Sequence, residues 1–207
     1  MAELKGMRIG CAMTGSFCTF SKAFDAWREL ADAGAELIPI MSENALSIDT
    51  RFYPAEQARN IFREICGRDI IHTIPQAEPI GPKKLLDLLV IAPCTGNTLA
   101  KLANGISDTA VTLAAKSHLR NGRPVLIAIS SNDALERNAA NIGTLFSMKN
   151  FFFVPFTQDD FSGKPASIVA DFERIKAAAE WALEGRQIQP LLIYCPSEAS
   201  ECPVMRF

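Results

Sequence analysis

The chain has 207 residues, of which 48% are apolar and 21% are charged, and its net charge is −2 at neutral pH. This length and balance suit one globular domain with a substantial core and exclude a disordered chain. The low net charge without a long basic patch argues against nucleic acid and membrane surfaces as partners, and no apolar run approaches the roughly 20 residues that span a bilayer.

Six cysteines and two histidines are spread along the chain without a C-x-x-C pair. Structural metal sites usually need such spacing, so we expect no bound metal. The first residues lead directly into a predicted strand and lack the apolar stretch of a signal peptide. We therefore expect a cytoplasmic protein with reduced thiols.

Predicted strands and helices alternate along the chain. In order, the pattern predicts a strand, a helix and a strand, then a helix, an irregular proline-rich connection and a strand. Two helices, a strand, a helix, a last strand and a closing helix follow. The ranges are 8–13, 20–33, 36–41, 54–66, 72–82, 88–92, 99–103, 108–119, 125–129, 134–146, 151–155 and 168–183.

This alternation predicts a parallel sheet that is covered by helices on both faces. With right-handed crossovers, the fold class is a three-layer α/β sandwich with a doubly wound sheet, Rossmann-like or flavodoxin-like. Pro39 weakens a central position for the strand at 36–41. We expect one domain over residues 1–193 and a loose C-terminal arm over 194–207.

Three polar loops follow predicted strands, at the edge of the sheet where ligands bind in such folds. They contain Thr14-Gly15-Ser16, Ser42-Glu43-Asn44 and the segment 93–98 with Thr95, Asn97 and Thr98. A helix that starts at Thr98 would offer unpaired backbone N–H groups to an anion. These neutral donors, without Lys or Arg among them, suit the phosphate of a mononucleotide, although each loop alone could be a capped turn. The loops have neither the three-glycine dinucleotide pattern nor a P-loop.

The third loop carries the clearest motif. The segment 93–101, PCTGNTLAK, is similar to the PAxANT motif of the flavoprotein family of homo-oligomeric flavin-containing cysteine decarboxylases, which also contains the flavin prenyltransferases. The segment 104–108 follows the G-x-x-D pattern of that family, and the resemblance covers about residues 7–155.

The resemblance implies a homo-oligomer that binds FMN. Thr14, Gly15 and Ser16 take the place of the family's first phosphate loop and Ser42 that of its second; Thr95 and Thr98 would lie near the phosphate, and Asn97 near the isoalloxazine ring or the substrate. Cys94 is placed beside the phosphate. At a helix start its pKa could be lowered, but a packed, inert cysteine is the more common case.

Longer segments resemble one branch of this family: TGSFCTF at 14–20, IMSENA at 40–45, the run 92–143 and QIQPLLI at 187–193. That branch implies an oxidoreductase component of sporulating bacteria. It would act with a separate, NADP-binding A subunit to oxidise a small dihydropyridine dicarboxylate. Asn97 and Asn132 would orient the ring and the carboxylate groups.

Two departures from the family pattern argue against cysteine decarboxylation. The second family signature, PxMNxxMW, keeps only Asn132, and Pro79 stands at the place of the family's active-site histidine. Proline has no titratable group and cannot act as a base. No residue is identified as the base, and His118 is expected on a solvated helix face. Two alternatives stay open: a stand-alone flavin-dependent oxidative decarboxylase and a non-catalytic interface subunit.

Overall fold

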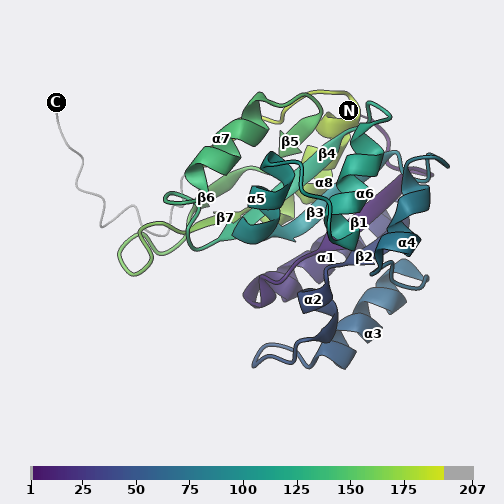
Figure 1. The fold of residues 1–207 in the computed structure, drawn as a ribbon, viewed down its shortest axis with the longest axis horizontal. Coiled ribbons are helices and arrows are strands. Elements are labelled where there is room, and N and C mark those ends of the chain that lie inside the picture. The colour runs from purple at the N-terminus through teal and green to yellow at the C-terminus, as the bar shows by residue number, and fades with distance from the viewer. Residues whose placement is uncertain (1, 194–207) are drawn as a thin grey trace.

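The computed structural model describes residues 2–193, and the predicted arm at 194–207 lies outside them. A seven-stranded sheet forms the centre of the molecule, with helices on both of its faces (Figure 1). The strands are β1 (Arg8–Met13), β2 (Glu36–Met41), β3 (Leu88–Cys94), β4 (Val125–Ser131), β5 (Phe151–Phe153), β6 (Phe156–Gln158) and β7 (Ile168–Ala170).

The sheet has the order β2-β1-β3-β4-β7-β6, and β5 pairs with the first half of β4. The pairs among β1 to β5 are parallel, whereas β7 pairs antiparallel with β4 and β6. The predicted α/β fold with a parallel-dominated sheet is therefore confirmed. Pro39 lies on β2, an edge strand, which agrees with the lack of a backbone N–H at that position.

The helices form two layers. The longest, α1 (Phe20–Asp32), contacts α3 (Ala55–Cys66) and α8 (Ile175–Leu183) on one side of the sheet. On the other side α6 (Ala110–Leu119) contacts α4 (Ile74–Ala77) and α5 (Gly96–Ala103), and α5 contacts α7 (Ala139–Ser147). The short α2 (Glu43–Ser47) follows β2 and packs on α3. Short 3-10 segments lie at Phe17–Thr19, Glu78–Ile80 and Phe172–Arg174.

Burial explains these positions. Every residue of β3 is buried, as expected for a strand between two helical layers. On α1, Phe24, Trp27 and Leu30 recur at helical spacing and are nearly or fully buried. The core therefore continues from the sheet into both helical layers.

The structure corrects the predicted course around Pro93. The strand continues through Pro93 to Cys94, with a cis Ala92–Pro93 bond and a register shift against β4. The next helix starts at Gly96 rather than Thr98, because Thr95 provides the N-cap: its hydroxyl accepts a hydrogen bond from the Thr98 N–H at 3.4 Å.

Three other predicted ranges are wrong in part. The stretch 72–82 contains α4, because Thr73 and Gln76 form a capping box. The helix predicted at 134–146 begins at Ala139, after a turn over 132–138. The helix predicted at 168–183 begins as the antiparallel strand β7, so 151–155 is not the last strand.

Candidate functional site

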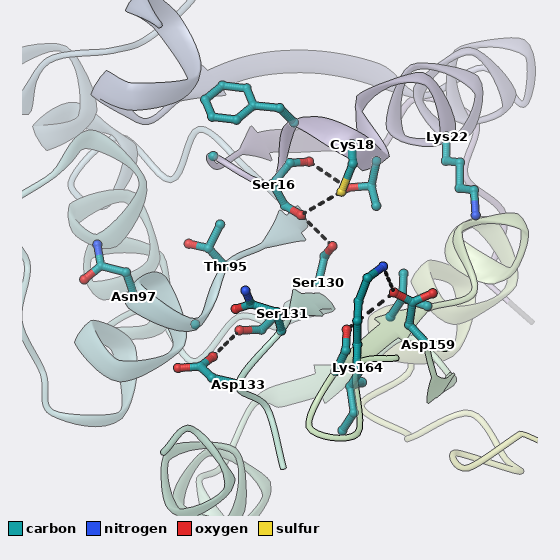
Figure 2. Close-up of a pocket in the computed structure, with 18 of the residues that line it drawn as sticks. Ser16, Cys18, Lys22, Thr95, Asn97, Ser130, Ser131, Asp133, Asp159 and Lys164 are labelled. Atoms are coloured by element: carbon teal, nitrogen blue, oxygen red, sulfur yellow. Dashed lines mark hydrogen bonds and ion pairs between the residues drawn. The ribbon is translucent and has the colours of Figure 1, made fainter. Parts of the chain in front are cut away.

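A cavity of about 760 Å³ lies beyond the carboxyl ends of β1, β3 and β4 (Figure 2). This volume is typical of a small-molecule site. Its walls come from the loops after these three strands, from α1 and from the hairpin between β6 and β7. The lining residues are Gly15, Ser16, Phe17, Cys18, Thr19, Lys22, Phe52, Thr95, Gly96, Asn97, Ser130, Ser131, Asn132, Asp133, Asp159, Lys164, Ser167, Ile168 and Val169.

Hydrogen bonds between hydroxyl groups join the loops after β1 and β4. The Ser16 and Ser130 hydroxyls are 2.7 Å apart, and in Figure 2 both side chains point toward the middle of the cavity. A Cβ on Gly15 would lie 3.6 Å from the Asn44 Cβ, so the loop after β2 also lies beside the loop after β1.

Thr14 and Thr95 join the loops after β1 and β3. The buried Thr14 hydroxyl donates to the Pro93 carbonyl at 2.8 Å and accepts from the Thr95 N–H at 3.0 Å. These bonds fix the geometry of the cavity wall. Thr14 therefore supports the site from behind rather than lining it.

The N-terminus of α5 faces the cavity. Its first N–H groups, those of Gly96 and Asn97, have no acceptor within the helix. Thr95 and Asn97 line the cavity, and the Asn97 side chain is exposed. Thr98 is buried, with its hydroxyl 3.1 Å from that of Thr95.

A polar cluster packs directly on Gly96. The Ser131 hydroxyl donates to Asp133 Oδ1 at 2.5 Å, and Asn138 Nδ2 donates to Asp133 Oδ2 at 2.8 Å. A Cβ on Gly96 would lie 2.5 Å from Asn138 Nδ2, 2.6 Å from Ser131 Oγ and 2.7 Å from Asp133 Oδ1. Only a glycine at this position leaves room for the cluster.

The sequence reasoning missed Asp133. The signal was present in two departures from the family motif: a glycine at 96 where PAxANT has alanine, and Ser-Ser-Asn-Asp at 130–133 in place of the second signature. Neither departure indicates a contact by itself, because the contact depends on the turn that follows β4.

Two lysines also line the cavity, although the three predicted loops contain none. Lys164, from the β6–β7 hairpin, forms an ion pair with Asp159 at 3.2 Å, and this pair raises the pKa of the Lys164 ammonium. Lys22 lies on the first turn of α1 and is exposed; within residues 2–193 it forms no ion pair. Both ammonium groups are drawn in Figure 2 near the β6–β7 side of the cavity.

The structure brings some of the predicted site residues together and not others. Those that line the cavity are Gly15, Ser16, Thr95, Asn97 and Asn132; those outside its lining are Thr14, Ser42, Cys94 and Thr98. The Ser42 hydroxyl caps α2, accepting from the Ala45 N–H at 3.3 Å. Cys94 is completely buried, and burial raises the pKa of its thiol, so it is not the reactive thiolate of a helix start.

The prediction for His118 is wrong. The side chain is 1% exposed, and its Nε2 lies 3.0 Å from the Pro124 carbonyl. Burial, with the charge of Arg123, lowers the pKa of His118 to about 4, although the Pro124 hydrogen bond and Asp87 act in the opposite direction. The imidazole is therefore a neutral part of the core.

Two further searches concern residues 2–193 alone. No group of His, Cys, Asp and Glu side chains among them is arranged to hold a metal ion. Across the same residues, no helix has the length and apolarity needed to cross a bilayer.

Comparison with known proteins gives matches over most of the chain. Residues 1–181 match the family model Flavoprotein. The chain is 45% identical to the B subunit of dipicolinate synthase from Bacillus subtilis (strain 168) over 193 residues, which cover 93% of this chain and 96% of that protein.

Solved structures give the same result. The B subunit of dipicolinate synthase from Bacillus halodurans C superposes with a TM-score of 0.86 at 40% identity, over 94% of this chain and 99% of that one. The FMN-dependent cysteine decarboxylase SpaF superposes with a TM-score of 0.65 at 18% identity, over 88% of this chain and 99% of that one, and so shares the fold. Because the family model covers most of the sequence and the Bacillus subtilis relative aligns over nearly all of it, the chain belongs to the Flavoprotein family.

Proposed function

We propose that this chain is the B subunit of a dipicolinate synthase, that it binds FMN in the cavity beyond β1, β3 and β4, and that it acts with an A subunit. The observation that carries the proposal is the meeting of Gly15, Ser16, Thr95 and Asn97 in one cavity with Ser130. Hydroxyl and amide donors from separate strand ends are suited to a phosphate and to the polar edge of a ring.

The donors divide the cavity into two parts. Gly15 and Ser16 precede α1, and the Ser16 hydroxyl meets that of Ser130, which suits this end to the phosphate of FMN. At the start of α5, Asp133 already places a carboxylate against Gly96. Two anions close together repel each other, so we place the phosphate at the Ser16 end rather than at Thr95 and Thr98.

The remaining polar groups suit a small dicarboxylate. The Asn97 and Asn132 side chains would orient the ring and its carboxylates, and Lys22 would attract a carboxylate across the cavity. Bound flavin would supply a hydride acceptor, or NADP on the A subunit would do so. The residues of this chain then position the dihydro ring and exclude water from it.

The proposed reaction is the oxidation of 2,3-dihydrodipicolinate to dipicolinate. The Bacillus subtilis relative is a dipicolinate synthase component, which supports this substrate, and its being one of at least two kinds of chain supports an A partner. The FMN dependence of SpaF supports a flavin on the shared fold. We propose a homo-oligomer in the cytoplasm of a sporulating cell, with NADP on the A subunit.

The test is a turnover assay with the full-length chain, the A subunit, NADP and dihydrodipicolinate, with and without added FMN. We expect dipicolinate to form only when both subunits are present, and Asn97→Ala to lower kcat at least about tenfold because the ring loses an orienting group. Ser147→Ala, which changes an exposed residue at the end of α7 outside the cavity lining, is the matched control.

Two results would contradict the proposal. Release of carbon dioxide from a peptidyl or pantothenoyl cysteine by this chain alone would favour a decarboxylase. Full activity of the Asn97→Ala pair, with a colourless chain that binds no FMN, would favour a non-catalytic interface subunit.

A further inference from the structure

The oxidation proposed above removes a hydride and a proton from the ring, so the site needs a proton acceptor. Two carboxylates line the cavity, those of Asp133 and Asp159. Asp159 is paired with Lys164 and also lies 3.5 Å from the Ser167 hydroxyl. Asp133 differs from it, because within residues 2–193 its carboxylate has neutral donors only and no basic partner.

The Asp133 carboxylate is held in one orientation. Ser131 and Asn138 each bind one of its two oxygens, and the backbone N–H groups of Glu136 and Asn138 donate to its main-chain carbonyl at 3.2 and 3.1 Å. A carboxylate has about four lone-pair sites, so these two side-chain bonds leave acceptor positions open to a ligand. Fixed orientation with spare acceptor capacity is what a general base requires.

Gly96 makes this arrangement specific to a chain without the family's alanine. A Cβ there would come within 2.7 Å of Asp133 Oδ1 and closer still to Ser131 and Asn138. The PAxANT motif and a carboxylate at this place are therefore mutually exclusive without a shift of the cluster. The departures at 96 and 133 belong to one structural change, which adds an acid–base group to the cavity.

We propose that Asp133 is the proton acceptor of the site and takes a ring-carbon proton from the dihydropyridine dicarboxylate. This inference rests on the proposed function. The C–H bond at one saturated ring carbon breaks, and its proton goes to a carboxylate oxygen of Asp133. The electron pair becomes a ring π bond as hydride leaves the neighbouring saturated carbon for the oxidant, an oxidised flavin or nicotinamide. One hydride and one proton are lost, which leaves the aromatic ring.

The test compares Asp133→Asn with wild type in the two-subunit assay and in product binding to the B subunit. We expect kcat to fall by at least about a hundredfold, with KM within about threefold of wild type. The fall of wild-type kcat at low pH should be lost in the variant. The other titratable groups that line the cavity, Cys18, Lys22, Asp159 and Lys164, are unchanged in it.

Product binding gives a readout that does not depend on turnover. Dipicolinate is a dianion, so removing the Asp133 charge should leave its affinity for the B subunit equal or higher. Added formate should restore part of the activity of Asp133→Ala by replacing the missing carboxylate. Glu136→Gln, an exposed carboxylate of the same turn outside the cavity lining, is the matched control and should keep wild-type kcat.

The outcomes separate this inference from the proposed function. If wild type turns over and Asp133→Asn keeps kcat within about threefold, or loses dipicolinate binding as strongly as it loses kcat, the inference is wrong. If the wild-type pair shows neither turnover nor FMN binding, the proposed function fails and the inference fails with it. If Asp133→Asn does not fold, Ser131→Ala decides: we expect a loss of about tenfold in kcat, and an unchanged kcat overturns the inference.

Discussion

Gly96 and the side chains on it form the tightest contact of the cavity wall. Three polar atoms, from Ser131, Asp133 and Asn138, approach the place where a Cβ would stand to within 2.5–2.7 Å. Real Cβ atoms do not accept such contacts, so any side chain at 96 must displace the cluster. The position of the Asp133 carboxylate therefore depends on a residue in another loop.

Gly96→Ala tests this contact. We expect the added methyl group to push Asp133 from its place and to lower the free energy of unfolding by about 1–3 kcal/mol, as overpacking does. Gly143→Ala is the matched control, because a Cβ at Gly143 on α7 meets nothing within 4 Å and alanine favours a helix interior. Equal unfolding midpoints for the two variants in urea would contradict the account.

His118 makes stability depend on pH. Its pKa is lowered to about 4 in the folded protein by burial, whereas the ordinary value is 6.5. Between these values the unfolded chain binds the proton and the folded chain does not, so stability falls as pH drops from about 6.5 to about 4. The full effect is roughly 3 kcal/mol.

His118→Gln should flatten that part of the stability curve. Urea unfolding at several pH values between 4 and 7 measures the slope. A variant slope equal to that of wild type would show that another group causes the dependence. His72, which is exposed on the chain before α4, offers a matched control, since its replacement should leave the slope unchanged.

At the scale of elements, one carboxylate joins the amino ends of three neighbouring strands. Asp87 directly precedes β3; it accepts from Arg8 of β1 at 2.8 and 3.0 Å and from Arg123, two residues before β4, at 2.9 Å. Burial acts to raise the pKa of Asp87, but the hydrogen bonds of Arg8 and the charges of both arginines outweigh it and lower the pKa. The stability from this group is present above its ordinary pKa and is lost as pH falls through the lowered value.

Asp87→Asn should lower the free energy of unfolding by about 1–3 kcal/mol, less than for a fully buried network because the side chain is partly exposed. The site lies at the opposite ends of the strands, so FMN affinity should be unchanged. Asp25→Asn removes an exposed pair with Arg28 on α1 and should cost at most about 0.5 kcal/mol. Equal losses in the two variants, measured by urea unfolding, would contradict a joint at the strand ends.

The elements also show where prediction from sequence succeeds. The strands at 8–13 and 36–41 were predicted at their observed bounds, because buried parallel strands are short apolar runs between turn signals. The segment 168–183 failed, since an antiparallel strand and a helix follow each other there without glycine or proline between them. Thr95 was expected among the ligand donors, and its role as the cap of α5 moved the helix start by two residues.

The site was predictable only as far as strand ends determine it. Gly15, Ser16 and Asn97 follow strands that the sequence places side by side, and they meet in the cavity. Asp133 and Lys164 reach it through a turn and a hairpin whose courses depend on tertiary contacts. Sequence patterns carry no direct signal for such contacts.

At the scale of the whole molecule, the strand order decides which loops can cooperate. The sheet order places β1 between β2 and β3, with β4 next, so four loops open at one edge of the sheet. The β6–β7 hairpin extends the sheet beyond β4 and forms the remaining wall, as Figures 1 and 2 show together. One cavity thus collects residues from distant parts of the chain.

The assembly state is a further prediction at this scale. By resemblance to its family we expect the chain to form a homo-oligomer, so light scattering on the purified protein should give a multiple of 22.6 kDa. A single species at the mass of one chain, across the concentrations used in the activity assay, would contradict this expectation.

The central claim, that the cavity beyond β1, β3 and β4 holds FMN, is tested most directly by titrating FMN with the full-length protein and following the quenching of flavin fluorescence. We predict saturation at one FMN per chain for wild type and clearly weaker binding for Ser16→Ala, with Ser147→Ala behaving as wild type. Unchanged fluorescence on addition of excess wild-type protein, or equal affinity of Ser16→Ala and wild type, would contradict the assignment of this cavity.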